Sequence, residues 1–396
     1  MADRPSPKPP LKRRSWSWRS QAFRGVVYQV LAVSVIALAA WFLTSNTLTN
    51  LRIRGIQSGF DFLIQPAGFG IGESVIAFDS SNPYWRAFLV GLTNTIRVAI
   101  IGILIATVLG TAIGIGRLSR NFLLRGVCTA YVELFRNIPV LLQLLMWYLL
   151  LNELLPPVAE ALNPAPGMYL SKGGFAFPVP VWAPGFGLML AGAIAGLALA
   201  WLYRRWAHAQ FAATGHARPV FWPALAIIVV GIVAGWFAAG APTALDMPEK
   251  TEFNVTGGAS VTPEFLALTL GLAIYTAAFI AEIVRSGIQA VPWGQIEAAS
   301  SLGLSRKRQL QLVLLPQALR VIIPPMTNQY LNLTKNSSLA VAVGYPDLVS
   351  ISNTTLNQTG RAVECITIIM AVYLTLSLST AALMNWYNAR AAIKER

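Results

Sequence analysis

Several polar and ionisable side chains of this sequence lie within or beside long apolar segments, where a charged or amide group is costly to bury. The densest group follows Pro324 and Pro325, which are expected to break a helix and free backbone groups for a bound polar solute. The alternative interpretation is a polar loop exposed to an outer compartment. The group comprises Asn328, Gln329, Asn332, Lys335, Asn336, Ser337 and Ser338.

A second set of polar side chains lies in two other apolar segments. Glu133 and Arg136 are three residues apart, so they share a helical face and can neutralise each other. We favour this structural pair over a contact with a solute. Pro139 is expected to kink the helix just beyond them, leaving nearby amides to face the interior. Arg97 points either inward or, by snorkelling, outward. The amides that complete the set are Asn94, Asn137 and Gln143.

The sequence lacks the residues that catalysis would need. His208 and His216 lie in one short basic loop, and Cys128 and Cys365 are isolated in apolar segments, so neither a catalytic triad nor a metal site or disulfide is expected. The 396 residues contain no Gly-x-x-x-x-Gly-Lys-Ser/Thr segment, the loop that cradles the phosphates of ATP. We expect a protein that is not an enzyme and binds no metal or cofactor itself.

The elements that position these residues are membrane helices. Of all residues 55% are hydrophobic and 12% are charged, whereas about a quarter are charged in soluble domains. A transmembrane helix needs about 20 mostly apolar residues. On that measure the fold class is all-α, a polytopic membrane protein. About eight transmembrane helices are expected, near 25–43, 88–116, 127–152, 186–203, 221–240, 263–284, 310–333 and 362–386.

The charge distribution orients these helices. The net charge is +14, and the basic residues gather in clusters beside the apolar segments. Positive-inside topology explains the clusters without a nucleic-acid partner. Threading eight spans from a cytosolic N-terminus places each basic cluster in the cytosol, so we expect both termini to be cytosolic.

One cytosolic segment, 292–316, joins the sixth and seventh expected spans. Pro292 suits a first helical turn, and Gly303 supplies a left-handed end. The adjacent alanines of Glu297-Ala298-Ala299 would let another protein's backbone approach closely. After Gly303 come nine residues and then Val313-Leu314-Leu315-Pro316. The segment therefore reads as a short helix and turn available to a partner.

This spacing resembles the signature loop of permease subunits in binding-protein-dependent ATP-binding-cassette importers, with Val313 where the pattern prefers isoleucine. In that family the loop is a coupling helix that docks in a cleft of a separate ATPase subunit. The resemblance implies that the acid anchors on the ATPase, the alanines fit its groove and the glycine makes the turn. The coupling residues it implies are Glu297, Ala298, Ala299, Gly303 and Pro316.

Further stretches resemble the polar amino-acid branch of that family, the histidine, glutamate, glutamine and arginine type, and most of all the permeases of general L-amino-acid importers. They imply a five-helix type I importer core with one N-terminal and two inserted helices added. In the family the turn matching Lys335 borders the substrate cavity, which implies that Lys335 contacts a carboxylate and Asn336 an ammonium. The stretches are 91–96, 131–139, 275–285, 316–325 and 332–339.

The resemblance also implies partners and a location. They are an ATPase dimer using ATP and Mg, an external periplasmic amino-acid-binding protein and a second related permease, for which we favour a heterodimer. The location is the bacterial cytoplasmic (inner) membrane. The alternative function is an ion-coupled secondary amino-acid transporter acting alone, although few acids lie within the spans. Which amino acids are preferred, and which permease holds the substrate, stay open.

The chain divides into five parts. Phe60, Phe62 and Phe69 of the external connector are expected to lie against lipid headgroups. The insertion opens with a proline-rich loop expected to sustain neither helix nor sheet, and small residues such as Gly192 and Gly196 permit close helix contact in its two spans. The parts are a basic cytosolic tail at 1–24, a first helix and connector at 25–87, permease core at 88–155, the insertion at 156–262 and permease core with the coupling loop at 263–396.

Overall fold

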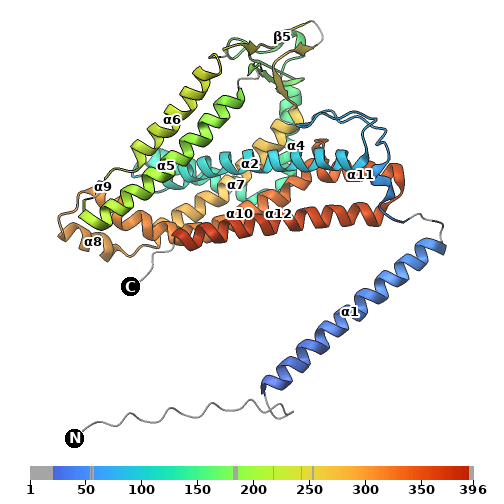
Figure 1. Ribbon diagram of the computed structural model, residues 1–396, viewed down its shortest axis with the longest axis horizontal. Coiled ribbons are helices and arrows are strands. Elements are labelled where there is room, and N and C mark those ends of the chain that lie inside the picture. Colours follow the sequence, from blue (N-terminus) through green and yellow to red (C-terminus); the bar gives the residue numbers. More distant parts are fainter. Residues whose placement is uncertain are drawn as a thin grey trace.

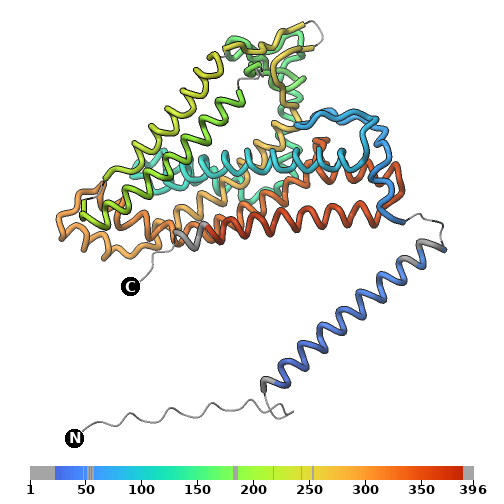
Figure 2. The backbone as a smooth tube through the Cα atoms, viewed as in Figure 1, coloured from blue at the N-terminus to red at the C-terminus, as the bar shows by residue number. Residues whose placement is uncertain are grey.

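The computed structural model describes residues 21–53, 55, 58–181, 186–216, 218–241, 243–251 and 254–391, so the expected basic tail lies outside it as far as residue 20. Helices make up most of this part of the chain, which confirms the all-α fold class (Figure 1). Within it, seven helices are long and apolar enough to cross a membrane, or eight if one bent pair forms a single span. The first, α1 (Gln21–Ile53), is exposed along nearly its whole length and lies apart from the others (Figure 2).

The core forms around α7, the most buried of the candidate spans. Glycines of α2 let the two helices approach closely, since a Cβ atom on Gly110 would lie 2.7 Å from Cβ of Ile280 and one on Gly114 would lie 2.7 Å from the Ala281 carbonyl oxygen. Small residues at such contacts are typical of helices packed in membranes. The helices packed against α7 (Pro263–Gln289) include α2 (Tyr84–Gly116), α4 (Val140–Leu154) and α10 (Leu315–Asn336), and α12 (Ala362–Ala391) packs on α10 from outside.

The third expected span is two helices and not one kinked helix. Helix α3 (Phe122–Asn137) ends before Pro139, and α4 starts directly after it at an angle of 108°. Proline disfavours helical backbone at the preceding residue, and Ile138 is extended. The side chain of Gln143 donates from Nε2 to the carbonyls of Phe135 and Ile138, at 2.9 Å each. It thereby binds the carbonyls that the bend leaves open.

The seventh expected span continues through its two prolines, contrary to the expected break. Helix α10 includes Pro324 and Pro325 and remains helical to Asn336. The irregular turns lie at its two ends instead. They follow α9 (Arg306–Gln309) as a π-helical turn, η3 (Leu310–Leu314), and follow α10 as a 3-10 helix, η4 (Ser337–Val343), which ends at Gly344 with φ of 80°. Each proline removes one hydrogen bond, and packing in the core outweighs that loss.

The two inserted spans, α5 (Phe186–Thr214) and α6 (Phe221–Ala238), pack on each other as a hairpin. The expected contact through small residues is confirmed: a Cβ atom on Gly192 would lie 2.3 Å from the Gly231 carbonyl oxygen, and one on Gly231 would lie 2.6 Å from that of Gly192. Side chains on their outer faces are exposed apolar residues, such as Leu190 and Val230. The hairpin therefore offers most of its surface to lipid.

The proline-rich part of the insertion contains short antiparallel strands, which corrects the expectation that it sustains no sheet. Pro156, Pro157, Pro164 and Pro166 precede the first strand, and Pro180 pairs with Leu245 at a two-stranded edge, where proline is tolerated. Strand β2 pairs with both β1 and β7, β3 with β4, and β5 with β6. The strands are β1 (Tyr169–Ser171), β2 (Gly174–Phe177), β3 (Val179–Pro180), β4 (Leu245–Asp246), β5 (Glu249–Lys250), β6 (Val255–Thr256) and β7 (Ala259–Val261).

The connector folds onto the core, so one expectation for its aromatic residues was wrong. Phe62, in the short helix η1 (Asp61–Ile64), is 1% exposed and packs edge-on against Tyr84, with ring centroids 5.7 Å apart. It belongs to an apolar cluster that includes Leu348 of α11 (Leu348–Thr359). Phe69 is partly buried against the same cluster, and Phe60 alone of the three is exposed. Burial within the protein, and not contact with headgroups, positions this loop.

Candidate coupling surface and translocation face

The expected coupling helix is present as α8 (Trp293–Ser301), which follows Pro292. Gly303 has φ of 71°, the left-handed backbone that ends the helix. The turn after it is closed by hydrogen bonds, because the Leu304 amide donates to the Ala299 carbonyl at 3.2 Å and Gln309 donates from Nε2 to the Leu304 carbonyl at 2.7 Å. Helices α8 and α9 lie together at one end of the long helices (Figure 1).

The outer side of α8 offers a mixed apolar and acidic surface. Glu297 and Ala298 are exposed, and so are two large apolar side chains, Trp293 at 69% and Leu302 at 80%. Exposed apolar groups of this size on a short helix are typical of a contact with another protein. Ala299 is buried, at 4% exposure, on the side that packs within the loop. Of the two alanines expected to face a partner, Ala298 is therefore accessible and Ala299 is not.

The coupling helix is connected to the core through α10. Pro316 is half-buried in the first turn of α10. Further along α10, Ala318 and Ile322 are buried, and Ile322 lies so near α7 that a Cβ atom on Gly287 would come within 2.3 Å of its Cγ1. The loop that contains α8 is thus continuous with α10, which packs on α7.

The polar group on α10 divides into an exposed face and a buried part. Asn328, Asn332 and Lys335 are exposed, and their spacing of four and three residues places them on one helical face. Asn336 is half-buried, at the last turn of α10. Ser337 is fully buried and donates its hydroxyl to the Thr334 carbonyl at 2.7 Å. Ser338 likewise donates to the Lys335 carbonyl, at 2.7 Å. Within this polar group, the exposed amides and the lysine are therefore accessible to a solute.

The candidates on α3 and α4 do not form the expected pair. Glu133 and Arg136 are both exposed, and among the described residues no ion pair joins them. Arg136 instead lies over the ring of Phe279, 5.2 Å from its centroid. Asn137 is exposed and donates to the Glu133 carbonyl, while Gln143 is buried at the bend described above. Of these residues only Glu133, Arg136 and Asn137 remain on a surface.

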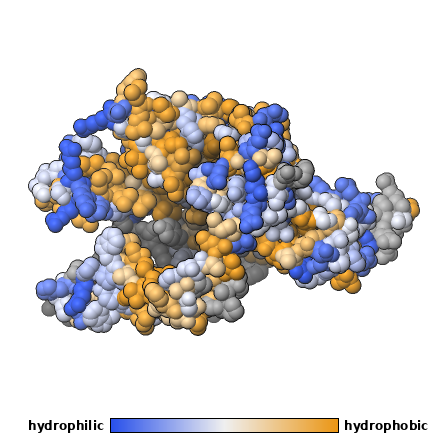
Figure 3. All heavy atoms as spheres, turned by 90° about the horizontal axis from the view of Figure 1, so that it is seen from above, coloured by the Kyte–Doolittle hydropathy of each residue, from blue (hydrophilic) through white to orange (hydrophobic). Residues whose placement is uncertain are grey.

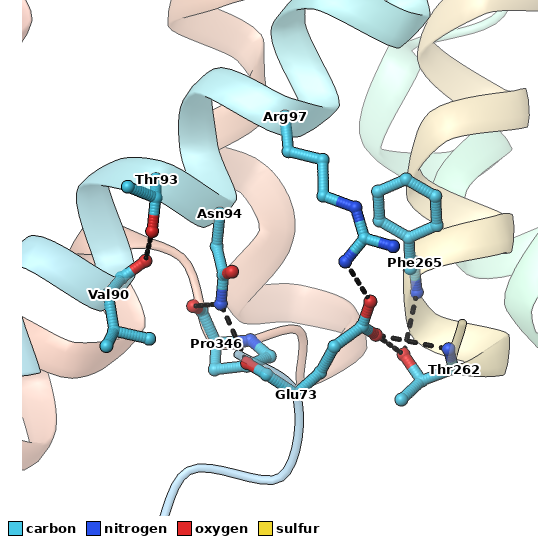
Figure 4. Close-up of polar contacts among 8 residues, drawn as sticks. All are labelled: Glu73, Val90, Thr93, Asn94, Arg97, Thr262, Phe265 and Pro346. Carbon is cyan, nitrogen blue, oxygen red and sulfur yellow. Dashed lines mark hydrogen bonds and ion pairs between the residues drawn. The ribbon is translucent and has the colours of Figure 1, made fainter. Parts of the chain in front are cut away.

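Asn94, which is fully buried, belongs to a cluster of polar contacts that we call the outer cluster (Figure 4). The amide of Asn94 donates to the carbonyls of Glu73 and Pro346, at 2.9 Å each. The Glu73 carboxylate accepts from Arg97 at 2.5 Å and from the amide and hydroxyl of Thr262 at 3.1 and 2.5 Å. The Arg97 guanidinium also lies 4.3 Å from the ring centroid of Phe265. Arg97 therefore points inward to an ion pair.

The outer cluster was not foreseen in the sequence. Glu73 stands alone among the glycines of the connector, 24 residues before Arg97. An arginine inside an apolar segment favours an acidic partner. The connector contains three acids that could pair with Arg97, but spacing along the sequence does not show which of them does. In the structure Glu73 ties the connector to the start of α7 and to α2.

A second buried acid, Asp347, lies beside this cluster in the loop between η4 and α11. Its carboxylate caps α11 by accepting from the Ser350 amide at 2.8 Å, and Tyr373 donates to it at 3.4 Å. Removal from water disfavours its charged form, which raises the pKa of Asp347 to about 7. This carboxyl can change its charge near neutral pH.

These features define the class of the protein, a polytopic α-helical membrane protein with an exposed helix and turn at one end. Apolar side chains cover much of the face seen in Figure 3, and hydrophilic ones gather toward its ends. Residues 211–393 match the family described as "Binding-protein-dependent transport system inner membrane component". The chain belongs to this family, which confirms the resemblance in its sequence.

Three relatives extend the match to nearly the whole chain. The general L-amino acid transport system permease protein AapQ of Rhizobium johnstonii is 47% identical and covers 98% of both chains. The putative amino-acid ABC transporter permease protein YhdX of Escherichia coli is 47% identical, over 96% of this chain and 98% of its own. The glutamate/glutamine/aspartate/asparagine transport system permease protein BztB of Rhodobacter capsulatus is 40% identical, over 94% and 95%.

Membership of this family defines the role of the chain within a transport system. The chain is a permease component, which is not itself catalytic, and in this family ATP is used by separate ATPase subunits while a binding protein supplies the solute. The comparisons give no support to the ion-coupled carrier acting alone.

Proposed function

We propose that this chain is one of two permease subunits that import L-amino acids across the bacterial cytoplasmic membrane. The observation that carries the proposal is the exposed surface of α8, where Glu297 and Ala298 stand beside Trp293 and Leu302 at the bend between α7 and α10. A short exposed helix with large apolar side chains and one acid is suited to the cleft of an ATPase subunit. Orientation follows from charge, because the basic residues Arg306, Lys307 and Arg308 next to it favour the cytosolic side.

In the proposed mechanism, motion of α8 moves the helices that line the translocation path of the substrate. When two ATPase subunits close on ATP, each would push its α8, and Pro316 would carry the displacement directly into α10. Because α10 packs tightly on α7 at Ile322 and Gly287, both helices would tilt together. Packed helices favour discrete arrangements over continuous bending, so the path would open to one side at a time.

The substrate would pass along the exposed face of α10. Asn328, Asn332 and Lys335 can replace the water around a carboxylate, and Asn336 and the carbonyls at the start of η4 can do so for an ammonium. These groups lie on the surface of a single chain, so a facing permease would complete the cavity. L-amino acids are proposed as substrates because the relatives AapQ, YhdX and BztB are named for amino-acid transport.

The assembly would contain this permease, a related second permease, two ATPase subunits and a periplasmic binding protein. We favour a heterodimer of permeases, with both termini of this chain in the cytosol. Purifying the complex through a tag on this chain and identifying the co-eluting chains by mass spectrometry tests that composition. Recovery of this chain with copies of itself alone would show a homodimer.

The decisive experiment is reconstitution. The complex in liposomes, with binding protein and labelled amino acid outside and ATP inside, should accumulate substrate only when ATP and functional ATPase subunits are present. Uptake by the permease alone, driven by a proton or sodium gradient, would overturn the proposal. Omitting the binding protein serves as the second control.

A further inference from the structure

A basic pocket of about 520 Å³ lies at the end of the bundle that carries α8. It is formed where α2 ends, α3 begins and α7 makes its last turns, and it takes no part in the coupling surface or the exposed face of α10. The lining residues of this basic pocket are Arg117, Phe122, Arg125, Gly126, Thr129, Ala130 and Arg285.

The basic pocket carries excess positive charge. Arg117 and Arg285 both pair with the carboxylate of Glu282, the latter at 2.5 Å, and Arg285 also donates to Gln289 at 2.6 Å. Arg125 is exposed and adds a third guanidinium. Three arginines and one carboxylate leave two uncompensated positive charges. The Arg117 side chain is only 10% exposed, and within the part of the chain that the structure describes its Nε has no hydrogen-bond partner, so the guanidinium is held in place with one donor unpaired.

The surroundings place the basic pocket at the level of lipid headgroups. It lies just beyond Gly116 and beside Arg285, at the ends of two helices long enough to span a membrane. The first turns of α3 add large apolar side chains that no part of the described chain covers: Phe122 is 74% exposed, Leu123 73% and Val127 69%. Basic and apolar groups side by side at this depth suit a molecule with an anionic head and an apolar tail.

We propose that the basic pocket binds the phosphate of an anionic phospholipid. The planar guanidinium groups suit phosphate oxygens, which they can bind with paired hydrogen bonds. The acyl chains would lie against Phe122, Leu123 and Val127. A bound lipid would add a further connection between the start of α3 and the ends of α2 and α7.

The test compares lipid stabilisation of two arginine variants. The full-length chain in mild detergent is titrated with phosphatidylglycerol or phosphatidylcholine, and thermal unfolding is followed by tryptophan fluorescence. Wild type should be stabilised saturably by phosphatidylglycerol and not by phosphatidylcholine. Arg125→Gln should weaken the apparent affinity for phosphatidylglycerol roughly fivefold, the loss expected from one basic residue near a membrane surface. The matched control is Arg120→Gln, an exposed arginine in the loop just before α3 that does not line the pocket.

Three results would overturn the proposal. Equal weakening by Arg120→Gln and Arg125→Gln would show attraction to general surface charge. Stabilisation by inorganic phosphate alone to the same extent as by phosphatidylglycerol would show a site for the free anion and not for a lipid. No difference between the two lipids would show that the head is not recognised. Since Arg125 is exposed, the unfolding temperature without added lipid should be the same for both variants and wild type. This comparison separates an effect on lipid binding from an effect on folding.

Discussion

Replacing Gly303 isolates the backbone of the coupling turn. Its φ is 71°, and a Cβ atom added there would meet no other atom within 4 Å, so a side chain fits and only the backbone is strained. An L-residue in left-handed helical backbone is less stable by about 1 to 2 kcal/mol, and a β-branched residue by more. That energy changes the population of the native turn by roughly 5- to 30-fold.

We therefore expect Gly303→Ala to reduce ATP-driven uptake and Gly303→Val to abolish it, with the protein still present in the membrane. Gly303→Asn should retain more uptake than Gly303→Ala, because asparagine tolerates this backbone better. The assay is uptake of labelled amino acid by proteoliposomes of the complex, normalised to the amount of this chain. ATPase activity measured in parallel should lose its stimulation by substrate, since the strained turn is the proposed link.

The matched control is Gly360→Ala at the far end of the molecule. Gly360 ends α11 with φ of 69°, and a Cβ atom there also meets nothing within 4 Å. It imposes the same backbone strain outside the coupling loop, so it should lower thermal stability while leaving uptake per folded molecule unchanged. Wild-type uptake by Gly303→Val would refute the reasoning, and equal loss by both alanine variants would show that strain acts through stability alone.

Three further predictions concern the substrate face, the outer cluster and its neighbour. Asn336→Asp should raise the ratio of arginine to glutamate uptake, because a fixed negative charge favours cationic amino acids; an unchanged ratio would remove Asn336 from the path. Glu73→Gln should lower the free energy of unfolding by about 2 kcal/mol, since a charged hydrogen-bond acceptor for Arg97 and Thr262 is lost. Thermal unfolding measures this loss, and the control Glu249→Gln, on an exposed strand, should leave the unfolding temperature unchanged. Burial raises the pKa of Asp347 to about 7, so between about pH 4 and 7 the folded chain keeps a proton that the unfolded chain releases, and stability should fall as pH rises through this window. Asp347→Asn, which can still cap α11, should flatten that pH dependence, and an unaltered slope between pH 5 and 8 would contradict the assignment.

Tertiary packing explains where the sequence-based expectations were wrong. Pro139 was expected to kink a helix, and the angle became 108° because Gln143 satisfies the carbonyls that a sharp bend exposes. Pro324 and Pro325 were expected to break α10, and it continued because its buried face packs on the core. Phe62 was placed at the headgroups and lies inside, since an aromatic residue in a connector carries no local sign of what covers it.

The sequence by itself determined whatever depends on neighbours along the chain. Hydropathy located the spans except for the bent pair α3 and α4, and the spacing from Glu297 to Pro316 located the exposed helix α8, because a signature confined to 20 residues is read from local order. The structure decided what depends on residues far apart: Glu73 meets Arg97 and Thr262 only when the connector folds over the first half of α2 and the start of α7. It also decided that Ala299 faces inward while Ala298 faces out, since which side of α8 is covered depends on how the following turn packs.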